Sequence, residues 1–147
     1  LIHGATIHAI GVGLDAPEGA VVEDLSGHLL HPGLVNAHTH GHGGLARGTG
    51  DRWTLELLLA ASPWIGGGRT LEDLHLSTLL CAAEMVLKGC TAAYDLAVEV
   101  PVPTREGLDA VASAYAAAGM RAVVAPMVGD LTLWQAVPGL LDALPEA

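Results

Sequence analysis

Two histidines separated by one residue are the part of this sequence best suited to chemistry. His38 and His40 close the stretch His31–His40, in which Pro32 and Gly33 mark a turn and the following apolar residues suit a short buried strand. Residues two apart in a strand point to the same face, so both imidazoles are expected to project into one space. Neutral imidazole is a common metal ligand. The pair therefore predicts part of a metal site. The alternative is a pair of histidines that are hydrogen-bonded within a core.

Two further polar residues are candidates for substrate binding. His42 lies two residues beyond His40, in the glycine-rich stretch 41–53. It could contact substrate, serve as a third ligand, or be an exposed loop residue, and the last interpretation is the default. Asp95 ends a second predicted strand, Cys90–Leu96. Its carboxylate could hydrogen-bond a ligand histidine or cap the loop after its own strand, and the sequence leaves both interpretations open.

The order of the predicted elements indicates an α/β fold. Short strands over Leu1–Ile10, Val21–Leu25 and His28–Leu30 predict a small β-layer. Strands then alternate with helices, which predicts parallel pairing with the crossover helices on one side of the sheet. The expected strands lie near Leu34–His38, Thr91–Asp95 and Arg121–Met127, and the expected helices over Thr54–Ser62, Leu71–Lys88 and Arg105–Ala118, with a further helical stretch from Asp130 or Thr132.

Composition excludes several classes of function. The chain has 147 residues, of which 51% are hydrophobic, and this is enough for a domain with a real core. A net charge of −10 with only six Lys and Arg argues against nucleic acid as a partner. No apolar run approaches the roughly 20 residues of a membrane span. Two cysteines without a CxxC pair favour a reducing compartment, so a cytoplasmic location is expected.

Four stretches of the chain resemble one enzyme superfamily. His31–His40 is similar to the first barrel strand of the metal-dependent amidohydrolase superfamily, and most similar to the branch of cytosine deaminases and triazine hydrolases, which includes adenosine-analogue deaminases. Val21–Gly27 resembles the turn before that strand, and Leu45–Gly48 resembles the Leu-x-Arg-Gly after the histidines. Lys88–Asp95 resembles the second barrel strand, with Cys90 where threonine is usual.

The resemblance implies a particular architecture. Residues 31–147 would form the first β/α units of a (β/α)₈ barrel, and residues 1–30 would form part of a small β-sandwich. A complete barrel typically needs about 250 residues. The sequence also opens with Leu1 and stops in a helix-like Leu140–Ala147 without a capping signal, so we expect an N-terminal fragment.

The resemblance also implies an activity. The expected reaction is hydrolysis of a non-peptide carbon–nitrogen bond in a small molecule, most specifically deamination of a nitrogen heterocycle by metal-activated water. His38 and His40 would bind a divalent metal, zinc first, with iron or manganese as alternatives. A third histidine, an aspartate and the proton-transfer residues would come from later strands outside this chain. We therefore expect the chain alone to be inactive, and a homo-oligomer is a further expectation for the parent protein.

Two rival interpretations remain at this stage. A metallo-β-lactamase-like hydrolase would show His-x-His-x-Asp-His, whereas here His42 occupies the aspartate position and Gly43 the position of the next histidine. The other rival is a non-catalytic or degenerate fragment that only binds metal or a partner. The short length of the chain favours it for this polypeptide.

Overall fold

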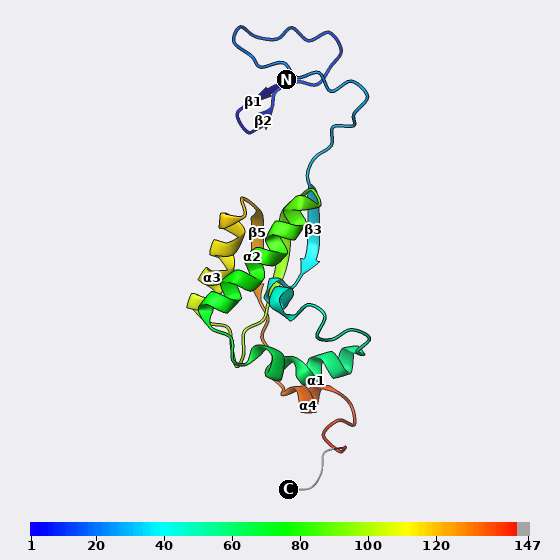
Figure 1. Ribbon diagram of the computed structural model, residues 1–147, viewed down its shortest axis with the longest axis vertical. Helices are drawn as coiled ribbons and strands as arrows, with labels where there is room; N and C mark the ends of the chain where they lie inside the picture. Colours follow the sequence, from blue (N-terminus) through cyan, green and yellow to red (C-terminus); the bar gives the residue numbers. More distant parts are fainter. Residues whose placement is uncertain (144–147) are drawn as a thin grey trace. The chain divides into compact units, whose positions relative to one another are not determined.

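The computed structural model describes residues 1–143 and divides the chain into two compact units, Leu1–Pro32 and a second unit that begins at Gly33 (Figure 1). In the first unit, β1 (Ile2–His3) pairs antiparallel with β2 (Thr6–Ile7). Gly4 lies in the turn between them with φ +59°, a conformation that glycine adopts without steric cost. The remainder of this unit consists of turns, bends and segments without regular secondary structure.

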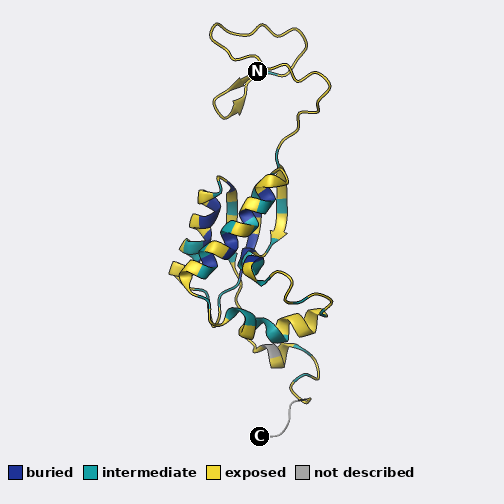
Figure 2. Cartoon of the chain, in the orientation of Figure 1, coloured by how far each residue is buried: buried dark blue, intermediate teal, exposed yellow. Residues whose placement is uncertain are grey.

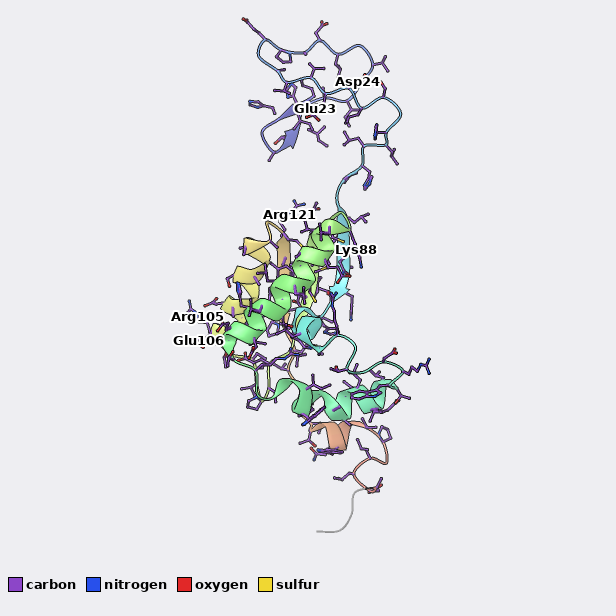
Figure 3. All side chains as sticks on the ribbon, viewed as in Figure 1. Glu23, Asp24, Lys88, Arg105, Glu106 and Arg121 are labelled. Carbon is purple, nitrogen blue, oxygen red and sulfur yellow. The ribbon has the colours of Figure 1, made fainter. Side chains whose placement is uncertain are left out.

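The small β-layer expected over residues 1–30 is limited to this hairpin. The strands expected at Val21–Leu25 and His28–Leu30 are not formed, so that prediction is wrong for this unit. Side chains that would cover each other in a sandwich are exposed, including Ile10 (88%) and Leu29 (86%), and Figure 2 shows the unit coloured as exposed almost throughout. Strands need partners for their main-chain hydrogen bonds, and a lone two-stranded hairpin is only marginally stable. The apolar residues of these segments alone therefore did not produce strands here.

The second unit contains a three-stranded parallel sheet, as predicted. Its strands β3 (Leu34–Thr39), β4 (Cys90–Ala97) and β5 (Arg121–Pro126) lie in the order β3-β4-β5. The helices α2 (Leu71–Leu87) and α3 (Arg105–Ala117) connect them, and both cover the same face of the sheet (Figure 1). The expected α/β fold class and parallel pairing are confirmed for this unit.

The two helices on the sheet each begin at a threonine cap. At the start of α2, the Thr70 hydroxyl accepts a hydrogen bond from the Asp73 amide at 3.1 Å, and the Asp73 carboxylate accepts one from the Thr70 amide at 2.9 Å. This reciprocal arrangement is a capping box. Thr104 caps α3 through the Gly107 amide at 3.0 Å. These caps fix the first turn of each helix that packs on the sheet.

The helix α1 (Leu55–Gly66) is longer than predicted. We expected a helix over Thr54–Ser62, ended by Pro63 and the glycines 66–68, but the helix continues through Pro63 to Gly66. Proline lacks the amide that would bond the carbonyl of Leu59, four residues earlier. The Ser62 hydroxyl donates to that carbonyl instead, at 2.7 Å. This replacement bond reduces the cost of proline inside the helix.

The core of the second unit lies between the two covering helices and the sheet, where Figure 2 shows the buried residues. Its buried members are Ala82, Met85, Ala93, Val111, Tyr115 and Met120. The outward-pointing residues of the strands remain accessible, as in Tyr94 (43%) and Val123 (54%). The alternation along β4 therefore places one set of side chains under the helices and leaves the other set on the open face.

Three smaller features complete the description. Gly41–Ala46, expected as an irregular loop, forms a 3₁₀ helix, η1. The short α4 (Leu133–Ala136) follows Thr132, as predicted. Of the helix-like end Leu140–Ala147, residues 140–143 form turns and the others lie outside the described residues. Within residues 1–143, the helices are too short or too polar to cross a bilayer.

Candidate functional site

The two histidines of the His-x-His pair face each other at the C-terminal end of β3. His38 is the fifth residue of β3, and His40 follows the strand immediately. Their Nε2 atoms lie 3.2 Å apart, and their ring centroids are 5.0 Å apart with the planes nearly perpendicular. Both side chains are exposed. The expectation that the two imidazoles share one space is met by this geometry.

β3 contains a bulge just before His40, which the alternation of side chains along a regular strand did not predict. Between the pairs Asn36–Ala93 and Thr39–Asp95, β3 advances by three residues while β4 advances by two. Such a bulge leaves main-chain groups without ladder partners and redirects side chains. Here the Asn36 side-chain oxygen accepts a hydrogen bond from the His38 amide at 3.2 Å. Asn36 therefore stabilises the bulge that sets the direction of His38.

The orientation of His40 is set by the main chain of the neighbouring strand. Its Nδ1 atom lies 3.0 Å from the carbonyl oxygen of Leu96 in β4. A carbonyl only accepts, so Nδ1 carries the proton and Nε2 is left with a lone pair. Metal-binding histidines commonly make such a bond from their second nitrogen. The sequence had left open whether the Asp95 carboxylate plays this role. In the structure the carboxylate bonds the amide of the next residue, Gly41, and the ring of His40 bonds Leu96.

Asp95 holds the backbone that directly follows His40. Its carboxylate is completely buried and accepts from the Gly41 amide, with the nitrogen 3.1 and 3.2 Å from the two oxygens. The Tyr115 hydroxyl donates to the same carboxylate at 2.9 Å. Burial raises the pKa of Asp95, whereas these two donors and nearby His40 oppose the rise. The capping interpretation expected Asp95 to hold the loop after its own strand, β4. In the structure Asp95 holds the backbone that follows β3 instead.

The 3₁₀ helix η1 is fixed to α2 by a buried serine and two close glycine contacts. The Ser77 hydroxyl donates to the carbonyl of His42 at 2.7 Å and accepts from the Leu45 amide at 3.1 Å. A Cβ atom on Gly44 would lie 2.1 Å from the Ser77 carbonyl oxygen, and one on Gly41 would lie 2.6 Å from an Asp95 carboxylate oxygen. Glycine is therefore required at both positions for η1 to approach α2 and β4.

His42 is half-buried, so the exposed-loop interpretation is not met. Its ring centroid lies 5.4 Å from that of His40, and its main-chain oxygen accepts a hydrogen bond from the Arg69 guanidinium. Burial, with smaller contributions from the charges of His40 and Arg69, lowers the pKa of His42 to about 4. The Nδ1 atom is buried and makes no hydrogen bond within the described residues. His42 is thus a neutral imidazole with an unused polar atom beside the His38–His40 pair.

The donor set around His38 and His40 fits half of a metal centre. Zinc–nitrogen bonds of 2.0–2.1 Å in a tetrahedral arrangement separate two ligand nitrogens by roughly 3.3 Å, and the two Nε2 atoms are 3.2 Å apart. Among residues 1–143, no cluster of three or more His, Cys, Asp or Glu side chains could hold a metal ion. The described chain therefore offers two nitrogen ligands and a fixed tautomer for one of them.

Several residues of this site were not identified from the sequence. Ser77, Leu96 and Tyr115 act through hydrogen bonds between elements that are distant in sequence, whereas Asn36 bonds the His38 amide within β3. One signal could have found Ser77: with Thr78, it is a small polar residue on an inner face of α2 whose other buried residues are apolar. The contact of Leu96 is made by its main-chain carbonyl, so its side-chain type carries no signal.

The fold and the pair of histidines define an α/β protein with a candidate metal site at the C-terminal end of a strand, and comparison with known families defines the class further. The family model described as Amidohydrolase family matches residues 29–143. The chain therefore belongs to the amidohydrolase family, which confirms the resemblance and implies a TIM-barrel fold. The match also favours this family over the metallo-β-lactamase-like alternative.

Curated relatives with similar sequences are named as deaminases. A 5-methylthioadenosine/S-adenosylhomocysteine deaminase of Syntrophomonas wolfei is 36% identical over 88% of this chain and 29% of its own length. An 8-oxoguanine deaminase of Pseudomonas aeruginosa is 29% identical over 93% of this chain and 31% of its own length. A 5'-deoxyadenosine deaminase of Methanosarcina mazei is 32% identical over 89% of this chain and 28% of its own length. The chain thus spans about three-tenths of the length of these relatives.

Proposed function

We propose that the whole protein is a metal-dependent hydrolase that deaminates a nitrogen heterocycle. The observation that carries this proposal is the convergence of the His38 and His40 Nε2 atoms at 3.2 Å, within a stretch that matches the amidohydrolase family. The relatives named as deaminases of adenosine derivatives and of 8-oxoguanine support an amino-substituted purine or a related ring as the substrate class.

In this proposal His38 and His40 bind a divalent metal, zinc first, with iron or manganese as alternatives. A metal held there would supply hydroxide at neutral pH by lowering the pKa of bound water from 15.7 to about 7. The Leu96 carbonyl keeps the Nε2 atom of His40 unprotonated and ready to bind. His42, a neutral imidazole next to the pair, donates or accepts a hydrogen bond to the heterocycle. For Asp95 we place a positioning role ahead of substrate contact, because its carboxylate is fully buried.

The proposal extends to the architecture. Residues 31–147 would form the first β/α units of the barrel, and residues 1–30 would pair with further strands in a small β-sandwich. In a barrel of this kind, active sites lie at the C-terminal ends of the strands. His38, His40, Asp95 and the Leu96 carbonyl all lie at that end of β3 and β4. We also propose a cytoplasmic location, which the acidic composition and the two free cysteines support.

Ammonia release from the whole, zinc-loaded protein tests the function. The panel should contain adenosine derivatives, aminopurines, aminopyrimidines and aminotriazines, together with a lactam and an ester. We expect release from at least one amino heterocycle, and loss of that activity in His38→Ala and His40→Ala. Turnover of the lactam or ester alone would contradict the deaminase assignment. No turnover of any compound by a protein that binds zinc stoichiometrically would favour a non-catalytic metal-binding protein.

A further inference from the structure

The region around His40 is held from β4 through two consecutive residues. The Leu96 carbonyl accepts from the His40 ring at 3.0 Å, and the Asp95 carboxylate accepts from the Gly41 amide at 3.1 Å. The first bond sets the ring and the second sets the backbone that leaves His40. Both must be satisfied together, because His40 and Gly41 are adjacent residues. The direction of His40 therefore depends on where the Asp95 carboxylate is held.

A buried tyrosine of α3, one of the helices that cover the sheet, holds that carboxylate. Tyr115 lies in α3, is 1% exposed, and its hydroxyl donates to Asp95 Oδ2 at 2.9 Å. Tyr115 also packs in the apolar core with Val111 and Met85. Packing alone would be served equally by phenylalanine, whose ring has the same shape. The hydroxyl is the part of Tyr115 that needs another explanation.

The charges around Asp95 indicate that the hydrogen bond from Tyr115 holds the carboxylate in its ionised form. Asp95 is in an environment that raises its pKa through burial, and the hydrogen bonds from Gly41 and Tyr115 stabilise the ionised form. Burial and the neighbouring charge of Asp95 raise the pKa of Tyr115 above its ordinary value, so its hydroxyl remains a donor. A carboxylate with only one of these two donors is free to rotate toward other partners. Two donors, one at the start of η1 and one on α3, restrict its orientation.

We propose that Tyr115 is a positioning residue for the metal ligand His40. Its hydroxyl fixes the Asp95 carboxylate, the carboxylate fixes the Gly41 amide, and the fixed backbone keeps the His40 ring on the Leu96 carbonyl. The proposal rests on the proposed function for the role of His40 as a ligand. It links a core residue of α3 to the site at the end of β3 through one chain of hydrogen bonds.

The test is Tyr115→Phe in the full chain, which removes the hydroxyl and keeps the ring. The nitrogen chemical shifts of His40, measured with ¹⁵N-labelled histidine in the metal-free protein, report which ring nitrogen carries the proton. We expect the proton to spread from Nδ1 to Nε2, and the Gly41 amide to exchange with solvent at least about tenfold faster. We also expect Zn²⁺ affinity, measured by competition with a chelator, to fall by about 10- to 100-fold, the usual effect of losing a partner behind a metal ligand.

Two control variants separate positioning from stability. Tyr94→Phe removes the hydroxyl of the other tyrosine, which lies on the open face of β4, and should leave all three readouts unchanged. Val111→Ala weakens the same core without touching Asp95 and should lower the unfolding midpoint while His40 keeps its tautomer. If Tyr115→Phe matches Tyr94→Phe in the His40 shifts and in Gly41 exchange, the proposal is overturned. Failure of the unsubstituted protein to bind Zn²⁺ would count against the metal site, whereas the tautomer of His40 would still decide the role of Tyr115.

Discussion

The Nδ1 atom of His40 lies 3.0 Å from the main-chain oxygen of Leu96, 56 positions further along the chain. This contact joins the ends of two neighbouring parallel strands at the edge where such sheets place their functional residues. It leaves Nε2 unprotonated, opposite the Nε2 of His38. The sheet therefore prepares the tautomer of one histidine before any ligand arrives.

Removal of either histidine should abolish metal binding at this site. In the whole protein, His38→Ala or His40→Ala should lower Zn²⁺ affinity and deaminase activity by more than about 100-fold, because loss of a partner that only supports a ligand already costs 10- to 100-fold. Zinc content after dialysis and ammonia release measure the two effects. His8→Ala, in the other compact unit, is the matched control and should behave as the parent. Full zinc content in both site variants would disprove the ligand assignment.

Gly44 should be far less tolerant of substitution than its neighbour Gly43. An alanine Cβ at position 44 would lie 2.1 Å from the Ser77 carbonyl oxygen, whereas one at position 43 would have no atom within 4 Å. We expect Gly44→Ala to lower the free energy of unfolding by roughly 1–3 kcal/mol, the usual cost of overpacking. Gly43→Ala should stay within about 0.5 kcal/mol of the parent. Denaturant unfolding of the two variants, side by side, provides the comparison, and equal stabilities would mean that η1 does not pack on α2 as described.

The elements of the second unit could be predicted because their signals are local. Thr70 and Thr104 are capping residues that start helices, and the apolar run before His38 behaves as a strand in a sheet. The first unit could not be predicted in the same way. The valines and leucine of Val21–Leu25 suit a strand, but a strand also needs a partner, and within that unit only the β1–β2 hairpin forms.

The site itself was only partly predictable. The spacing of His38 and His40 gave their shared direction, although the structure reaches it through a bulge that Asn36 stabilises. The role of Asp95 depends on a contact with Gly41, 54 residues away, and on Tyr115 from another helix. Such contacts arise from tertiary packing, and residue type and spacing carry no information about them.

The capping box of α2 should give a pH-dependent contribution to stability. Hydrogen bonds from the amide and hydroxyl of Thr70 lower the pKa of Asp73 below its ordinary 3.8. The folded state thus binds the proton less readily than the unfolded state, so the stabilisation is present above pH 3.8 and is lost as the pH falls through the folded value. Asp73→Asn should unfold at a lower temperature than the parent at pH 7, and this difference should disappear at low pH.

A matched variant controls for general charge effects in the same turn. Glu72→Gln removes a neighbouring carboxylate without touching the cap, so it should retain the pH dependence of the parent. Thermal unfolding followed between pH 7 and pH 2.5 compares the three proteins. A constant difference between parent and Asp73→Asn across this range would contradict the assignment of the effect to Asp73.

Loss of the Ser77 hydroxyl should lower the free energy of unfolding, because this hydroxyl anchors η1 to α2. Its hydroxyl serves the His42 carbonyl and the Leu45 amide, and it is completely buried. Ser77→Ala removes both hydrogen bonds, each worth about 0.5–1.5 kcal/mol, and leaves Arg69 as the partner of the His42 carbonyl. Ser113→Ala, on the exposed side of α3, should cost less than about 0.5 kcal/mol. Urea unfolding measures both, and equal losses would show that Ser77 does not anchor η1.

The last prediction concerns the choice of substrate and His42. Its main chain is held by Arg69 and Ser77, so the ring has a fixed place beside His40, and its buried Nδ1 atom has no hydrogen-bond partner within the described residues. If the imidazole pairs with the heterocycle through its other nitrogen, Nε2, in both ground and transition states, its loss affects binding more than chemistry. In the whole protein, His42→Ala should raise KM about tenfold and change kcat by less than about twofold.

The controls for this prediction exploit the other histidines. His75→Ala removes an imidazole that contacts Ser113 on α3 and should leave both kinetic constants unchanged. Zinc content should stay at the parent level in His42→Ala, because His42 is not a ligand in this proposal. A loss of zinc together with a fall in kcat would instead make His42 a third ligand. An unchanged KM with a lower unfolding midpoint would make it a packing residue of η1, and either outcome would remove it from substrate recognition.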